Sequence, residues 1–210
     1  MIEFSVSALL ATARAPAPES PRQHLRDHLA AHVTAVSDLS WYFDRALPRF
    51  HEGTEVRLAV EELVDHLGRA MGFAVDRPDQ DDACAVWSSA ALGARLLVWA
   101  LDAPTTIARA GSFSRTRDQL LPQLHAPTLD RVSSLCVICG PVDRRLMQDA
   151  IVLRRAAEQV RLVTVDALMA LGGLVERRCL THEAAITVLR PQSALADPLV
   201  RMLSESRTGF

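Results

Sequence analysis

Hydrophobic residues recur at helical spacing near the start of the chain. Leu25, Leu29 and Val33 lie four residues apart, and the preceding Ser20 and Pro21 are typical of a helix start. The proline-rich stretch just before this helix is the best candidate for a linker. The pattern therefore predicts a helix that begins near Ser20.

From about residue 54 to residue 191 the pattern alternates between helical and strand-like spacing. A helix is predicted over 54–71, because its apolar residues fall on one side and Gly72 can end it. Strands are predicted over 73–76, 82–87, 95–101, 131–140 and 160–163. Further helices are predicted over 142–159, 166–171 and 181–189, and the segment 105–124 is mixed. This alternation predicts an α/β fold with one central sheet.

The chain divides into three predicted regions. We expect an N-terminal extension over 1–52 that is largely helical, an α/β domain over 53–192, and a C-terminal tail over 193–210. The extension contains an aromatic-rich segment over 41–50, although aromatic residues make up only 5% of the chain. This concentration indicates either a docking surface or a cap over the main core.

The composition is that of a globular protein with a substantial core. Of the 210 residues, 49% are hydrophobic and 23% are charged. The longest apolar run, over 96–101, is far shorter than the roughly 18 residues that a membrane span needs. The N-terminus lacks the pattern of a secretory signal, so we expect no membrane association and a cytoplasmic location.

Every one of the 23 basic residues is arginine, and the chain contains no lysine. A Schiff-base lysine, a phosphate-loop lysine and a lysine that assists a nuclease metal site are therefore excluded. The net charge of −2 excludes a global positive field that would attract nucleic acid. Binding to DNA would require a local arginine patch or a basic partner.

Two motifs suggest metal or redox chemistry, and we interpret both as structural. Cys136 and Cys139 have CxxC spacing, but on a strand two residues three apart point to opposite faces. His24, His28 and His32 recur every four residues on the predicted helix, yet no carboxylate or cysteine is placed to complete a metal shell.

The order of a helix, three strands, a helix and a strand resembles the core of the PD-(D/E)xK nuclease superfamily, the restriction-endonuclease-like fold. The segment 60–73, which contains Glu61 and ends in Gly-Phe, resembles the first helix of that family. Asp82 stands at the head of the second predicted strand, where the metal-binding Asp is expected, and 96–102 resembles the third strand. The resemblance covers about 140 residues and implies an αβββαβ core, a mixed central sheet flanked by helices.

The resemblance also implies which side chains should hold Mg²⁺. A phosphodiester is hydrolysed there by one or two Mg²⁺ ions held by carboxylates, with a lysine that orients the attacking water. Asp82 matches the Asp, but the Glu position carries Trp99 and the Lys position carries Leu101. An indole cannot bind Mg²⁺ and an isobutyl group cannot direct a water molecule. A shifted site could instead combine Asp82 with Asp102 and Glu61.

We therefore expect a catalytically degenerate nuclease-fold domain that is non-catalytic or only weakly catalytic, with no cofactor unless it is active with Mg²⁺. It would act as a DNA-binding or scaffolding subunit, in an assembly for restriction, phage defence or repair, with a protein partner or as a homodimer. Arg109, Arg115 and Arg117 are the candidate DNA contacts. One alternative is a Mg²⁺-dependent DNA endonuclease with catalytic Asp82, Asp102 and Glu61. Another is an unrelated α/β interaction or regulatory module.

Overall fold

The structure is a computed structural model that describes residues 21–77, 84–102, 104–106, 132–140, 160–190 and 196–207. Its helices are α2 (Pro21–His32), α3 (Leu39–Ala46), α4 (Thr54–Ala70), α8 (Val165–Glu176), α9 (His182–Leu189) and α10 (Asp197–Arg207). Two short 3₁₀ helices flank α3, at Val36–Asp38 and Leu47–Arg49. The strands are β1 (Ala74–Asp76), β2 (Ala85–Ser89), β3 (Ala94–Leu101), β4 (Val132–Ile138) and β5 (Val160–Thr164).

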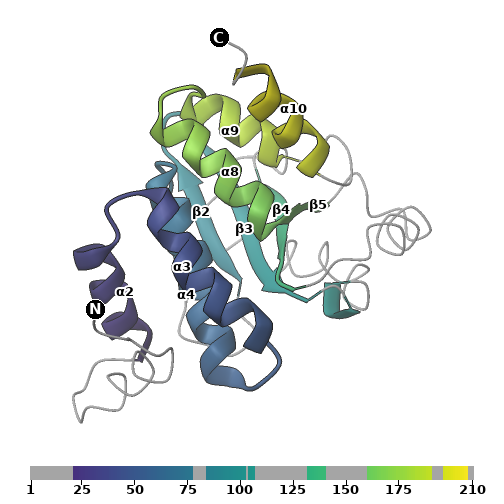
Figure 1. The fold of residues 1–210 in the computed structure, drawn as a ribbon. Coiled ribbons are helices and arrows are strands. Elements are labelled where there is room, and N and C mark those ends of the chain that lie inside the picture. Colours follow the sequence, from purple (N-terminus) through teal and green to yellow (C-terminus); the bar gives the residue numbers. More distant parts are fainter. Residues whose placement is uncertain are drawn as a thin grey trace.

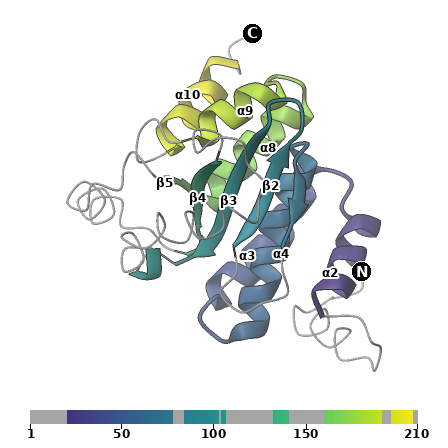
Figure 2. The same cartoon turned by 180° about the vertical axis from the view of Figure 1, so that it is seen from behind.

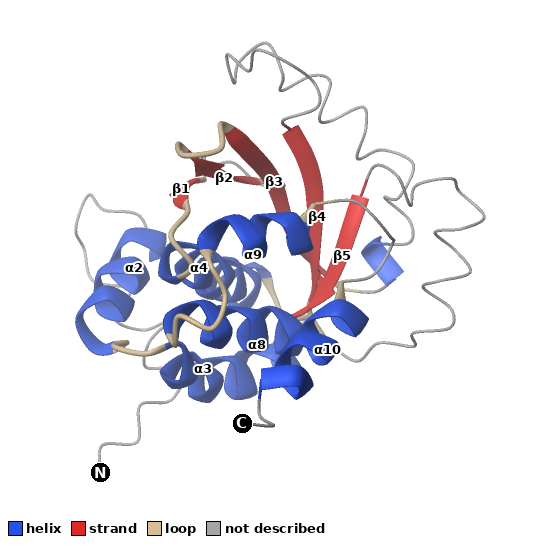
Figure 3. Cartoon of the chain, turned by 90° about the horizontal axis from the view of Figure 1, so that it is seen from above, coloured by secondary structure: helices blue, strands red, loops and turns tan. Residues whose placement is uncertain are grey.

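The five strands form one mixed sheet in the order β1-β2-β3-β4-β5. The pairs β1–β2 and β2–β3 are antiparallel, whereas β4 is parallel to both β3 and β5. The long described helices lie together on one face of this sheet (Figure 3). The predicted α/β architecture, a mixed central sheet flanked by helices with an N-terminal helical part, is confirmed.

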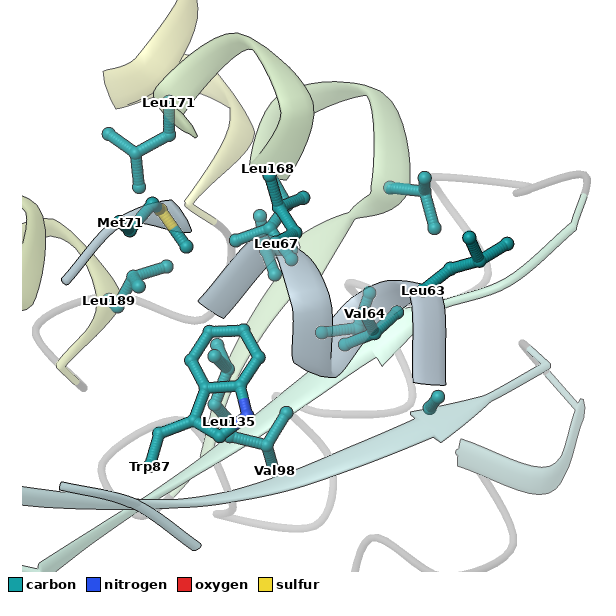
Figure 4. Close-up of a cluster of buried hydrophobic side chains, with 14 of the residues drawn as sticks. Leu63, Val64, Leu67, Met71, Trp87, Val98, Leu135, Leu168, Leu171 and Leu189 are labelled. Atoms are coloured by element: carbon teal, nitrogen blue, oxygen red, sulfur yellow. The ribbon is translucent and has the colours of Figure 1, made fainter. Parts of the chain in front are cut away.

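The core lies between that face of the sheet and the helices (Figure 4). Alternate β3 residues enter it, namely Ala94, Leu96, Val98 and Ala100. From α4, Val64 and Leu67 pack against this layer, and α8 adds Leu168 and Leu171. The helix predicted over 54–71 is thus amphipathic, and its apolar side faces the sheet.

The N-terminal helical part belongs to the same core. Helices α2 and α3 both contact α4 (Figures 1 and 2). Leu29, Phe43 and Phe50 are buried in the core cluster, whereas Trp41 is 36% exposed. Most of the aromatic-rich segment thus caps the core, and Trp41 is the aromatic residue that it leaves at the surface.

Several element boundaries differ from those predicted. The strand predicted over 82–87 is observed at Ala85–Ser89, while residues 82 and 83 lie outside the described part. The helix predicted over 166–171 runs on to Glu176, through Gly172 and Gly173. The helix predicted over 142–159 also lies outside the described residues. In the segment taken as a C-terminal tail, α10 packs on α8 and buries Val200 in the core cluster.

Candidate functional site

A cavity of about 170 Å³ opens beside the carboxyl end of β3. It is lined by Phe50, His51, Arg57, Glu61, Arg77, Trp99, Ala100, Leu101, Asp102 and Thr105. Its wall therefore combines α4, the end of β3 and the loop before α4. Two of the acidic residues of the predicted shifted site, Glu61 and Asp102, meet at this cavity.

The Glu61 carboxylate is surrounded by arginine side chains. Arg22 Nη2 donates to Glu61 Oε2 at 2.6 Å, and Arg77 Nη1 lies 3.4 Å from the same oxygen. Arg57 Nε lies 3.9 Å from Glu61 Oε1, one turn earlier on α4. Both carboxylate oxygens thus face guanidinium groups, and the negative charge of Glu61 is balanced within the protein.

Arg77 is held by a second, fully buried acid. Its Nε donates to Asp65 Oδ2 at 2.5 Å and its Nη2 to Asp65 Oδ1 at 3.2 Å, and the Trp87 Nε1–H donates to Asp65 Oδ1 at 3.1 Å. Burial opposes the charge on Arg77, but the neighbouring Asp65 and Glu61 carboxylates raise its pKa overall. Arg77 is therefore a fixed cation that joins the end of β1 to α4.

The Asp102 carboxylate is bound by a backbone N–H and faces a histidine, not arginine side chains. The Thr105 backbone N–H donates to Asp102 Oδ1 at 2.6 Å, which caps the helical turn over 104–106. His51 Nδ1 lies 3.3 Å from Asp102 Oδ2. Each of the two Asp102 oxygens thus already faces a donor group of the protein.

Strand β3 offers no acid or amine at the cavity before Asp102. The core cluster contains Val98 and Ala100, so alternation places Trp99 and Leu101 on the other face of the strand. A one-residue shift of register toward the C-terminus would bring Ala100 and Asp102 to these two positions, and the opposite shift would bring Val98 and Ala100. Neither face presents the Glu-x-Lys pair that the resemblance requires.

These contacts do not fit a Mg²⁺ site within the described residues. Magnesium requires several oxygen ligands in near-octahedral geometry. Glu61 and Asp102 are bound to donors of the protein, and in the described ranges no three His, Cys, Asp or Glu side chains could share a metal ion. Any contribution of Asp82 lies outside the described residues, as do those of the predicted DNA contacts Arg109, Arg115 and Arg117.

The residues that line the cavity include neither of the other two motifs. Cys139 belongs to the core cluster and Cys136 does not, and the Cys136 Sγ lies 3.3 Å from Thr106 Oγ1, so the two thiols occupy opposite faces as predicted. The His28 and His32 rings stack with centroids 4.3 Å apart, and His28 Nε2 lies 3.3 Å from the Tyr42 hydroxyl.

Sequence reasoning missed the cations of this site. Arg57 could have been found, because it lies four residues before Glu61 on a predicted helix. Arg22 and His51 had no such signal, since each meets its acidic partner through tertiary packing, and Arg22 lies 39 positions before Glu61 in the sequence. The signal for Arg77 was equally weak, because it follows a strand of only three residues.

Comparison with known proteins finds similarity only to solved structures. No protein-family description matches the chain, and no curated protein matches it either. Two of the solved structures that match are of the restriction endonuclease FokI, the second of them bound to DNA, at 10% sequence identity with TM-scores of 0.48 and 0.47. They cover 81% and 82% of this chain, and the chain spans only 33% of the FokI chain. Among the described residues, every helix is too short or too polar to cross a membrane.

Proposed function

We propose that this domain has the architecture of a nuclease but does not hydrolyse nucleic acid, and that it acts as a binding subunit for DNA or a partner protein. One observation carries the proposal. At the cavity, the acidic groups are already bound by arginine, histidine and backbone donors, and β3 supplies only apolar residues before Asp102.

The chemistry supports a loss of catalysis. Hydrolysis of a phosphodiester at such a site depends on a metal ion that polarises the phosphate and generates hydroxide. A metal ion would have to displace Arg22 and Arg77 from Glu61, which would leave two guanidinium groups beside a dication. The electrostatic cost of that arrangement favours the arginine-bound state.

A plasmid assay tests this function. Purified protein is incubated with supercoiled plasmid and Mg²⁺ or Mn²⁺, and the appearance of nicked and linear DNA is measured. We expect no protein-dependent cleavage. Cleavage that disappears in both Asp82→Ala and Asp102→Ala would instead establish a Mg²⁺-dependent endonuclease.

That endonuclease is the second candidate, because Glu61 and Asp102 line one cavity. It requires Arg22 or Arg57 to move from Glu61 when DNA binds, and Asp82 to complete the ligand set. If the domain is an endonuclease, Asp102→Asn should abolish cleavage while the fold is retained. If it is a non-hydrolytic binding subunit, neither the wild-type protein nor Asp102→Asn should cleave DNA.

The salt dependence of binding distinguishes DNA from a protein as the binding partner. The net charge of −2 gives no general attraction to DNA, so binding to DNA would depend on local arginine residues. A labelled duplex titrated with protein at several salt concentrations would show affinity that falls steeply with salt if phosphate contacts dominate. Absence of binding at low salt would favour a protein partner or self-association.

A further inference from the structure

Several residues with hydrogen-bond donor groups line the cavity beside β3. Arg57 lines it with a side chain that is 32% exposed, and Thr105 and His51 lie on the same wall. A guanidinium carries five N–H groups in a fixed fork and can donate to more than one acceptor at a time. The lining is therefore suited to an acceptor-rich ligand.

The acidic residues of the cavity cause little electrostatic repulsion of such a ligand, because each is paired with a donor group. Arg22, Arg57 and Arg77 form one network with Glu61 and Asp65, so three guanidinium groups face two carboxylates. Asp102 is the remaining acid of the lining, and its oxygens face Thr105 N–H and His51 Nδ1. The three arginines thus balance Glu61, Asp65 and Asp102, so the acids around the cavity leave no net negative charge to repel an anion.

We infer that this cavity binds a phosphate group without a metal ion, with Arg57 as its main contact. The inference deepens the proposed function, on which it rests, because it names the ligand class of the same non-hydrolytic site. Arginine binds phosphate through paired N–H···O bonds, and the fixed cations Arg22 and Arg77 keep Glu61 from repelling the anion.

The size of the cavity limits the ligand. About 170 Å³ corresponds to roughly five or six water molecules at about 30 Å³ each. One phosphate group with its oxygens fits that space, whereas an attached nucleoside must lie outside. The cavity therefore suits a backbone or terminal phosphate of a larger molecule, with specificity set by whatever lies beyond it.

The test uses inorganic phosphate as the probe, in EDTA and at low salt, with binding followed by titration calorimetry and by the arginine Nε–H signals in NMR spectra. We expect saturable binding that Arg57→Gln weakens by roughly tenfold or more, the loss expected for a charge-assisted hydrogen bond. Arg57→Lys should retain part of the affinity. Arg49→Gln is the matched control, since Arg49 pairs with Glu52 outside the cavity lining and its loss should change nothing.

Asp102→Asn separates a metal-free site from a metal-bridged one. It removes a negative charge from the lining, so phosphate should bind more tightly in EDTA. Equal affinities of the Arg57→Gln and Arg49→Gln variants, or no binding in EDTA, would overturn the inference while leaving the proposed function standing. Binding that needs Mg²⁺ and is lost in Asp102→Asn would overturn both. Metal-free binding through Arg57 together with plasmid cleavage would overturn the proposed function alone.

Discussion

The indole of Trp87 packs directly on the backbone of Gly68 in α4, so closely that a Cβ atom at Gly68 would lie 2.6 Å from Trp87 Cε2. Trp87 is fully buried and its Nε1–H donates to Asp65, so the ring cannot move aside freely. The absence of a side chain at position 68 therefore sets the distance between α4 and β2.

This contact predicts that Gly68→Ala destabilises the protein. Alanine favours a helix over glycine by about 1 kcal/mol, but overpacking a close contact costs about 1–3 kcal/mol. Gly173→Ala in α8 is the matched control, because its new methyl group would meet only the flexible end of Arg177 at 3.3 Å. Chemical denaturation should show a lower unfolding free energy for Gly68→Ala and an unchanged or higher one for Gly173→Ala. Equal effects would contradict the packing argument.

The buried pair between Arg77 and Asp65 gives a second prediction. Their side chains are 1% and 0% exposed. Asp65→Asn therefore leaves the buried positive charge of Arg77 without its main carboxylate partner, and it removes the charged acceptor of the Trp87 Nε1–H. We expect a loss of about 3 kcal/mol in the free energy of unfolding. The exposed pair between Arg201 and Glu205 serves as the control, and Glu205→Gln should leave stability essentially unchanged. A comparable loss in both variants would refute the distinction.

Two histidines predict a dependence of stability on pH. Burial and the neighbouring His32 lower the pKa of His28, and burial and Arg69 lower the pKa of His66 although Glu62 opposes this. In the unfolded chain both bind protons near their ordinary value of 6.5, before the folded protein does. Stability is therefore fully present above that pH and falls as the pH drops through it. Denaturation curves between pH 8 and pH 5 should show this slope, and His66→Gln together with His28→Gln should flatten it.

The cysteines should differ in reactivity. Burial raises the pKa of Cys84 to about 11 and raises that of Cys139 well above its ordinary value, so neither forms the thiolate readily. Cys179 is partly exposed, and we expect alkylation of the native protein at pH 8 to label it first, as measured by peptide mass spectrometry. Early labelling of Cys136 or Cys139, or a disulfide between them, would contradict the structural role of the CxxC spacing.

The sequence predicted the fold well where local pattern decides it. The helix over 54–71 and the strand over 95–101 have a clear apolar side or run, and both were placed within a residue or two. The helix predicted over 166–171 was too short, because tertiary packing holds α8 in helical form through Gly172 and Gly173, two residues with low helix propensity. The close approach of Gly172 to Leu67 shows this, since a Cβ atom there would lie 2.8 Å from Leu67 Cδ1.

The candidate site was predictable only in part. Glu61 and Asp102 could be named because a resemblance pointed to their segments. The arginine residues that bind Glu61 could not, since Arg22 reaches it from another helix through the packing of α2 on α4. Whether a carboxylate is open to a metal ion or bound to arginine is a property of tertiary contacts that no local pattern records.

Direct measurement of divalent metal binding tests whether the cavity beside β3, in which arginine side chains already bind Glu61, can hold a metal ion. Mn²⁺ can be titrated into the protein at low salt and the free ion followed by electron paramagnetic resonance. We expect no stoichiometric binding site, and no difference in Mn²⁺ binding between the wild-type protein and Asp102→Asn. One Mn²⁺ ion bound per chain, and released by Asp102→Asn or Glu61→Gln in a folded protein, would contradict it.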